Sequence, residues 1–224
     1  MYIKGNYKIF SILFFILIFS LLTACANEME DQGNDNGLIP GNTERVEDDI
    51  LAYFPLNQGM FYDYAGEGME YTAFTREVKY KEEPYFQVHD SNAGTTIASI
   101  YKIEESQLTI VNRQEEFYSD ENIIEELIED EEVSEIVLQK PLEVGNSWET
   151  GNRNSEIVAI EDELEVPAGI FYDIIKIKVE NTDQDTFTTY KYYAKNIGLI
   201  MEENIGEDYR MRSKLQAFEK NKKN

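Results

Sequence analysis

The sequence predicts a mainly β fold, in which about ten strands form an antiparallel curved sheet, a half-barrel or a sandwich. Polar and apolar residues alternate with a period close to two, most clearly from Tyr71 to Tyr80. The chain contains 15 tyrosines and 12 phenylalanines, and aromatic residues favour strands. The pattern Pro-Leu-x-x-Gly occurs at 55–59 and again at 141–145, and this repetition suggests two similar halves.

The first half begins with a turn that ends at Gly59. Proline fixes its own φ and glycine permits a tight turn, so Pro55 and Gly59 mark the entry into a strand. Residues 60–65 and 71–80 are expected to pair as strands through a hairpin at Gly66-Glu67-Gly68. Further strands in this half are predicted at 84–88, 95–103, 108–111 and 136–138.

The segment before the second half has a different character. Residues 115–135 include many acidic residues and no basic one. Within them Ile123, Ile124, Leu127 and Ile128 recur at a spacing of three to four, which is typical of one face of a helix. One short acidic helix is therefore predicted here, with its charged face towards solvent.

The second half is organised like the first, so that residues 53–138 and 140–219 form an internal repeat within one β-rich domain, 50–219. Trp148 follows the second Pro-Leu-x-x-Gly turn and is expected to close one end of the core. Residues 220–224 are expected to be a tail. Strands in this half are predicted at 156–161, 173–179, 186–194, 199–203 and 209–218.

The first 24 residues are predicted to be a signal peptide. Lys4 and Lys8 precede an uncharged apolar run from Ile9 to Leu22. A basic start, an apolar run of about 7–15 residues and small residues before a cut site are typical of secretory signals. The run is shorter than the roughly 18 apolar residues that a transmembrane helix needs, and an uncleaved signal anchor is the alternative.

The residues Leu22-Thr23-Ala24-Cys25 resemble the lipobox of bacterial lipoproteins. The resemblance implies that the Cys25 thiol carries a diacylglycerol, that the chain is cut before this residue, and that the new amino terminus is often acylated. It also implies a lipid anchor at the outer face of the cell membrane. Residues 25–49 are rich in Asn, Asp, Glu and Gly, and they are predicted to be the lipidated cysteine and a disordered acidic tether.

Three short motifs form a second resemblance. They are PLxxGxxW at Pro141–Trp148, VPAGxF at Val166–Phe171, and the run Tyr192–Ile200. Together they resemble a group of poorly characterised β-rich lipoproteins and secreted domains from Gram-positive bacteria. The resemblance covers most of residues 50–205 and implies an antiparallel β domain in the cell envelope. That group has no agreed activity, so no catalytic residue is implied.

The chain is strongly acidic, with 20 lysines and arginines against 44 aspartates and glutamates and a formal net charge of −24. A chain of this charge is repelled by nucleic acid, so no nucleic-acid partner is expected. Cys25 is the only cysteine, and its lipidation would leave no thiol for a disulfide, a metal site or a nucleophile. The expected partners are the membrane, through the anchor at Cys25, and a protein or an apolar ligand.

No catalytic, cofactor-binding or metal-binding residue is predicted. His89 is the only histidine, whereas a zinc site needs three or four ligands, and no Gly-x-Ser-x-Gly elbow supplies a nucleophile for it. We therefore expect His89 on the surface at the end of a strand. Gly59 and Gly66 lack the helix that a phosphate-binding loop requires. Among 44 acidic residues some pair lies at a glycosidase-like separation by chance, so carboxylate pairs are not informative.

The aromatic residues of the predicted strands either fill the core or line a groove for a lipid, a glycan or a peptide. In the last strand Arg210, Arg212 and Lys214 form a basic stripe that is expected to face acidic neighbours in the sheet. The sequence thus predicts a membrane-anchored extracytoplasmic lipoprotein that binds and does not catalyse. The alternatives are a carrier of a lipid or another apolar ligand in the concave face of the sheet, and a carboxylate-based envelope hydrolase.

Overall fold

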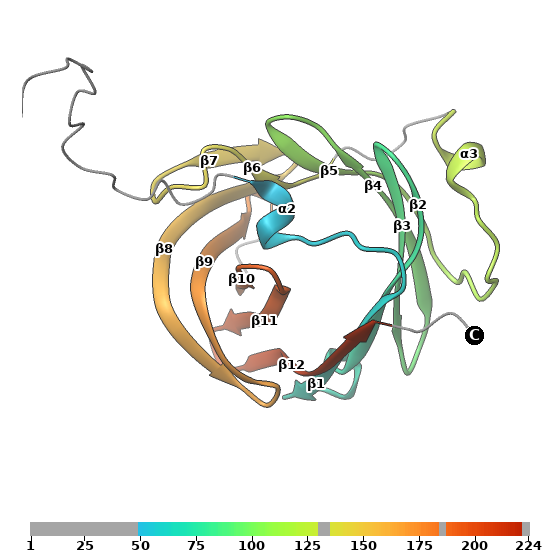
Figure 1. The fold of residues 1–224 in the computed structure, drawn as a ribbon. Helices are drawn as coiled ribbons and strands as arrows, with labels where there is room; N and C mark the ends of the chain where they lie inside the picture. The colour runs from blue at the N-terminus through green and yellow to red at the C-terminus, as the bar shows by residue number, and fades with distance from the viewer. Residues whose placement is uncertain (1–48, 130–134, 184–186, 221–224) are drawn as a thin grey trace, which may run out of the picture. The chain divides into compact units, whose positions relative to one another are not determined.

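The computed structural model describes residues 49–129, 135–183 and 187–220, which form one antiparallel sheet of 12 strands (Figure 1). The predicted signal peptide, the Cys25 anchor, the tether as far as residue 48 and the tail from 221 lie outside the described residues. The sheet curls until its edges approach each other, which gives it a nearly closed, barrel-like shape (Figure 1). The mainly β prediction is confirmed, whereas the sandwich alternative is wrong because all the strands belong to one sheet.

Each half of the sheet contributes six strands. The first six are β1 (Met60–Glu67), β2 (Phe74–Glu82), β3 (Tyr85–Asn92), β4 (Thr96–Ile103), β5 (Gln107–Gln114) and β6 (Glu135–Gln139). The last six are β7 (Ser147–Thr150), β8 (Arg153–Val166), β9 (Gly169–Asn181), β10 (Phe187–Ala194), β11 (Gly198–Gly206) and β12 (Arg210–Lys220). The described helical segments are α2 (Ile50–Tyr53), the 3₁₀ helix η1 (Glu70–Thr72) and α3 (Ile124–Leu127).

The strand order is β6-β5-β4-β3-β2-β1-β12-β11-β10-β9-β8-β7. Each half is a meander in which consecutive strands pair, and the first and last strands, β1 and β12, pair in the middle of the sheet with Met60 opposite Lys220. The edges of the sheet are β6 and β7, which are consecutive in the sequence.

The two edges are joined by side chains rather than by a ladder of backbone hydrogen bonds. The indole Nε1 of Trp148 in β7 donates to the carbonyl oxygen of Ile136 in β6 at 3.0 Å. The N–H of Ile136 donates in turn to Oγ1 of Thr150 at 3.2 Å. Trp148 is buried in the main core, so its ring fills the closure while its N–H connects the edges. We call this junction the seam.

The two Pro-Leu-x-x-Gly segments end in matching turns. Gly59 and Gly145 both have a positive φ, 84° and 91°, which glycine adopts without a steric penalty. The N–H of Gly59 donates to the carbonyl of Val78 in β2 at 2.8 Å, and the N–H of Gly145 donates to the carbonyl of Ile157 in β8 at 2.8 Å. The repeated sequence therefore encodes a repeated junction between a turn and the second strand of each half.

Two of the register shifts in the first half have a counterpart in the second half. The register shifts between Val78 and Tyr80 in the β2–β3 ladder, and between Ile157 and Ala159 in the β8–β9 ladder. The next matching pair of shifts lies between β4 and β5 and between β10 and β11. Bulges increase the local bend of a strand, so bulges at matching places curve both halves in the same manner.

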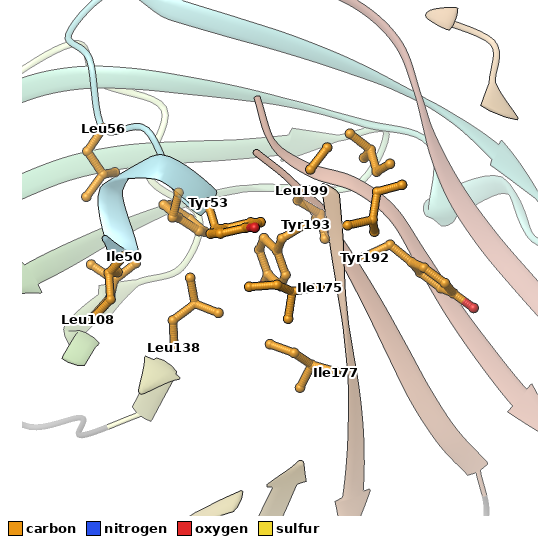
Figure 2. Close-up of a cluster of buried hydrophobic side chains, with 14 of the residues drawn as sticks. Ile50, Tyr53, Leu56, Leu108, Leu138, Ile175, Ile177, Tyr192, Tyr193 and Leu199 are labelled. Carbon is orange, nitrogen blue, oxygen red and sulfur yellow. The ribbon is translucent and has the colours of Figure 1, made fainter. Parts of the chain in front are cut away.

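The main core lies on the inner face of the curled sheet. Figure 2 shows Ile50 and Tyr53 of α2 beside Leu108, Leu138 and Tyr193, which come from strands of both halves. The α2 turn begins after Asp49, whose carboxylate accepts the N–H of Leu51 at 3.0 Å, and its Ile50 and Tyr53 side chains are buried. One helical turn thus covers part of the open end of the sheet (Figure 1).

A second, smaller apolar cluster lies on the outer face, where residues 115–129 pack across β3, β4 and β5 (Figure 1). Its members are Ala98, Ile100, Val111, Phe117, Ile123 and Ile124. The predicted acidic helix is present as α3, but it is only four residues long. Like charges at neighbouring positions destabilise a helix, and a segment without basic residues cannot offset them, which accounts for the short length.

Candidate ligand-binding cavity

The inner face of the sheet is not completely filled. A cavity of about 480 Å³ remains, with a wall formed by residues from both halves. Five aromatic rings contribute to it, those of Phe54, Tyr71, Phe74, Tyr101 and Tyr193. Small-molecule sites commonly have volumes of about 300–1,000 Å³, so this cavity has the size of a ligand site.

The wall also carries eight charged side chains, four cationic and four anionic, so their formal charges sum to zero (4 − 4) in a chain of net charge −24. They are Arg76, Arg113, Arg153, Lys191, Asp90, Glu115, Glu135 and Glu202. The cavity is therefore much less negative than the rest of the protein, and it is a polar chamber rather than an apolar one.

The most tightly bound pair is Arg76 with Asp90, which are cross-strand neighbours in β2 and β3. Both bonds of the fork, Nε to Oδ1 and Nη2 to Oδ2, measure 2.7 Å. The guanidinium also lies 5.7 Å from the ring centre of Phe54 and 5.9 Å from that of Phe74. Burial lowers the pKa of Arg76, but the carboxylate of Asp90, together with Tyr101 and Tyr64, outweighs burial and raises that pKa well above its ordinary value. This pair is a fixed part of the wall.

Glu135 is shared by two arginines. Its Oε2 lies 2.7 Å from Nη2 of Arg113, and its Oε1 lies 2.9 Å from Nη1 of Arg153. Burial raises the pKa of Glu135, but the positive charges of Arg113, Lys191 and Arg153 together lower it by more than burial raises it, so the net shift is downward. Because Glu135 begins β6 and Arg153 begins β8, this ion pair spans the seam.

Lys191 and Glu202 form a much looser pair. They are cross-strand partners in β10 and β11, and their charged atoms are 3.8 Å apart, which is beyond hydrogen-bond distance. About 28% of the Lys191 side chain is exposed to solvent. The Lys191 ammonium is therefore less committed to a protein partner than the guanidiniums of Arg76 and Arg113.

His89 does not lie at a strand end on the surface, as the sequence led us to expect. It is in the middle of β3 and only 7% exposed, because residues 115–129 cover the outer face there, and its ring packs edge-on against Phe117 at 5.3 Å. Its Nε2 is 2.8 Å from the amide Nε2 of Gln87. His89 is thus part of an outer-face contact, and it does not line the cavity described above.

The basic stripe of β12 lies opposite acidic residues, as predicted. Arg212 bonds Glu203 of β11 at 2.6 Å, and Arg210 lies 3.4 Å from the same carboxylate. On the other side, Lys214 lies 2.7 Å from Glu67 of β1. These charges stabilise the middle of the sheet.

Two absences concern only the residues that the structure describes. Within residues 49–129, 135–183 and 187–220, no cluster of three or more His, Cys, Asp or Glu side chains could hold a metal ion. Across the same ranges, none of the helices has both the length and the apolar character needed to cross a membrane.

The sequence predicted a ligand in the concave face only as an alternative, and an apolar one; it did not identify the charged wall, although one signal was available. In the alternating run of β2, the residues on one face are Phe74, Arg76 and Val78, so a charged residue interrupts an apolar face. Such an interruption predicts a buried ion pair or a polar chamber. The partner of Arg76, Asp90, could not be identified, because the sequence does not show the register in which β2 pairs with β3.

Comparison with known proteins shows no family for this chain. No protein-family model matches the sequence, and a search of curated proteins finds no match. Two solved structures are similar: a proposed exported protein with a YmcC-like fold from Bacteroides fragilis, and a proposed lipoprotein from Parabacteroides distasonis. The first shares 12% identity at a TM-score of 0.43 and covers 73% of this chain and 97% of its own. The second shares 12% identity at a TM-score of 0.41 and covers 75% of this chain and 98% of its own. Likeness at these TM-scores carries no argument about function.

Proposed function

We propose that this protein is a membrane-anchored extracytoplasmic lipoprotein that binds a small polar ligand in the cavity of its curled sheet, and that it is not an enzyme. The cavity carries the proposal, because its wall combines paired charges with aromatic rings such as those of Tyr101 and Tyr193. Ligand sites typically combine apolar surface with a few well-placed polar groups. The location follows from the signal peptide and from the lipobox that ends at Cys25.

A carrier of an apolar ligand is the second candidate. The rings of Phe54, Tyr101 and Tyr193 favour it, because they offer apolar surface inside the concave face. A lipid chain in the same space would also exclude water from Arg76 and Glu135, and desolvating ions is costly, at several kcal/mol per ion. The charged wall therefore favours a polar ligand.

The carboxylate hydrolase receives less support. Such an enzyme needs one carboxyl group with a raised pKa to act as a general acid. Among the residues that the structure describes, three carboxyl groups have clearly shifted pKa values, namely Glu67, Asp120 and Glu135, and the lysines and arginines beside them shift all three downward. Our proposal therefore assigns the cavity to binding.

The binding proposal can be tested on the full-length protein in detergent with a panel of small polar molecules. A ligand at about 100 times its Kd stabilises the folded state by about 2.7 kcal/mol, which a thermal melt detects. The variant Ile97→Trp places a large ring in the cavity wall and should abolish that shift. Ile160→Trp is the matched control, because Ile160 is 43% exposed and lies outside the wall. Stabilisation that persists in Ile97→Trp contradicts the proposal.

The anchor is tested separately at Cys25. We expect Cys25→Ser to abolish both the incorporation of a radiolabelled fatty acid and the cleavage of the signal peptide, because serine offers no thiol for the diacylglycerol. Ser20→Ala, within the apolar run, is the control and should be lipidated normally. Unchanged labelling and membrane association of Cys25→Ser would show that the lipobox assignment is wrong.

A further inference from the structure

Three cations gather on one part of the cavity wall. Arg113 from β5, Arg153 from β8 and Lys191 from β10 surround Glu135, and all three lower its pKa. Glu202 lies 3.8 Å from Lys191, and Glu115 also lines the cavity. The four cations and four carboxylates of the whole wall balance, in a chain whose net charge is −24. We call Arg113, Arg153 and Lys191 the cationic triad.

The triad retains donors for a ligand. The ion pairs with Glu135 engage one terminal nitrogen of each arginine, whereas a guanidinium has five N–H donors. Arg153 is the more accessible of the two arginines, with 47% of its side chain exposed. The Lys191 ammonium has three donors, and its distance to Glu202 is too long for a hydrogen bond. An oxyanion placed between Arg153 and Lys191 would therefore meet donors that the protein itself leaves available.

The rest of the wall indicates what is attached to that oxyanion. Tyr101, Tyr193 and Ile110 line the same cavity as the triad. Both tyrosines are held as neutral phenols, because burial raises the pKa of Tyr101 to about 12 and also raises that of Tyr193. They therefore present flat rings without added negative charge, a surface that suits an apolar or aromatic body.

We propose that the cavity binds small organic oxyanions, in which a carboxylate or a phosphate meets the cationic triad and a compact apolar body lies against the tyrosine rings. This inference rests on the proposed binding function and specifies the chemical class of its ligand. The acidic exterior of the protein repels anions in general, so affinity for one would come from the triad itself and weaken as salt screens its charges.

The test compares three probes of the same ring size on the full-length protein in detergent by isothermal titration calorimetry. Benzoate and phenyl phosphate carry the two oxyanions, and benzyl alcohol is the neutral match. We expect both anions to bind at least about tenfold more tightly than the alcohol, since charge-assisted hydrogen bonds are roughly twice as strong as neutral ones. The difference between the two anions identifies which oxyanion the triad prefers.

Two variants move the affinity in opposite directions. Lys191→Met removes a cation that lies 3.8 Å from Glu202, too far for a hydrogen bond. This variant should weaken phenyl phosphate binding about tenfold. Glu202→Gln removes the opposing carboxylate and should tighten the same binding. Lys178→Met is the control for the first variant, because Lys178 is on the adjacent strand β9, pairs with Glu180 at 2.6 Å and lies outside the cavity wall. If Lys191 had only a structural role, Lys191→Met and Glu202→Gln would not change the affinity for phenyl phosphate in opposite directions.

The outcomes separate this inference from the function on which it rests. If benzyl alcohol binds as tightly as the anions, or if Lys191→Met binds phenyl phosphate like the wild type, the inference is overturned while the binding function stands. If none of the three probes binds at millimolar concentration, both the inference and the binding function are overturned.

Discussion

The Arg76–Asp90 fork is a charged pair set into an otherwise apolar stretch of the inner face. The Arg76 side chain is only 13% exposed and packs beside two phenylalanine rings. Breaking one partner of a buried pair leaves an uncompensated charge, whereas replacing both partners by neutral groups does not. The fork therefore fixes how β2 and β3 present the cavity wall, and its loss has a defined energetic signature.

Replacing Asp90 by asparagine tests that signature. We expect Asp90→Asn to lower the free energy of unfolding by about 2–3 kcal/mol, because the Arg76 guanidinium would remain buried without its counterion. The double variant Arg76→Met with Asp90→Asn should recover more than half of that loss in a urea titration. Equal losses in the single and double variants would show that the pair acts through packing and not through its charges.

A second residue-scale feature is the fully used amide of Gln87. Its Oε1 accepts the N–H of Ile123 at 2.9 Å, which fixes the orientation of the amide. Its Nε2 donates to the carbonyl of Glu121 at 2.9 Å and faces Nε2 of His89 at 2.8 Å. The imidazole nitrogen must therefore be the acceptor, and a proton on it would meet an amide N–H. This geometry holds His89 neutral.

The pKa of His89 is lowered by burial and by the positive charge of Lys79, against opposing contributions from Glu77, Asp120 and Asp90. A lowered pKa means that the unfolded chain binds the proton more readily than the folded one. The stabilising contribution is thus present above the ordinary value of 6.5 and is lost as the pH falls through the lower, folded-state pKa. The loss begins near the ordinary value, which lies above the usual pKa range of carboxyl groups.

We therefore predict that the wild-type protein loses stability between pH 7.5 and pH 5.5, at a slope that approaches about 1.4 kcal/mol per pH unit at most. His89→Gln keeps an acceptor for Gln87 but cannot titrate, and its free energy of unfolding should be nearly flat over this range. Because His89 is the only histidine, the wild type and the variant differ in this one titration. Parallel curves for the two proteins would refute the assignment.

At the scale of elements, the matching turns at Gly59 and Gly145 explain how a short motif sets the start of each half. A Cβ built on Gly145 meets no atom within 4 Å, so only the backbone conformation, with φ of +91°, restricts this position. The left-handed conformation is unfavourable for most residues by about 1–2 kcal/mol. The turn therefore offers a test of conformation without a change in packing.

Gly145→Ala should lower the free energy of unfolding by about 1 kcal/mol, because alanine resists a positive φ. Gly145→Asn should have a smaller effect, since asparagine visits this region more readily. Both values come from equilibrium denaturation in urea. An alanine variant as stable as the wild type would show that the turn relaxes to a different conformation.

Most strands were predictable because alternation and turn residues are local signals. β2, β10 and β12, with their alternating or aromatic runs, were found close to their observed bounds. β7 was missed, because its four residues contain only one apolar side chain, Trp148, and one residue cannot show a period. The twelve strands thus exceed the predicted ten or so. A ligand in the concave face was among the predicted alternatives, but the charged wall of the cavity could not be predicted, because its charged pairs join strands whose register only the fold defines.

At the scale of the whole molecule, the seam is the one place where neighbouring strands lack a ladder, as far as the described residues show. Trp148 contributes both a buried ring and the hydrogen bond to Ile136. The two contributions can be separated, because phenylalanine keeps most of the ring volume and removes the N–H.

Trp148→Phe should lower the free energy of unfolding by about 1–3 kcal/mol, because it removes the seam hydrogen bond and leaves a small void. Hydrogen exchange should then accelerate in the amides of β6 and stay unchanged in β1 and β12, which pair in the middle of the sheet. Uniform acceleration over all strands would mean that the seam does not open as a local unit.

The strand order also has a consequence for how the chain could be rearranged. Every pairing within a half joins strands that are consecutive in sequence, and the exception, β1 with β12, joins the two extremes of the domain. If the chain were opened in the turn between β6 and β7 and its present ends were linked, each strand would follow its own neighbour around the ring. That circular permutant would contain only local pairings, and topologies of low contact order fold fastest. The native chain thus completes its sheet only when its last strand reaches its first.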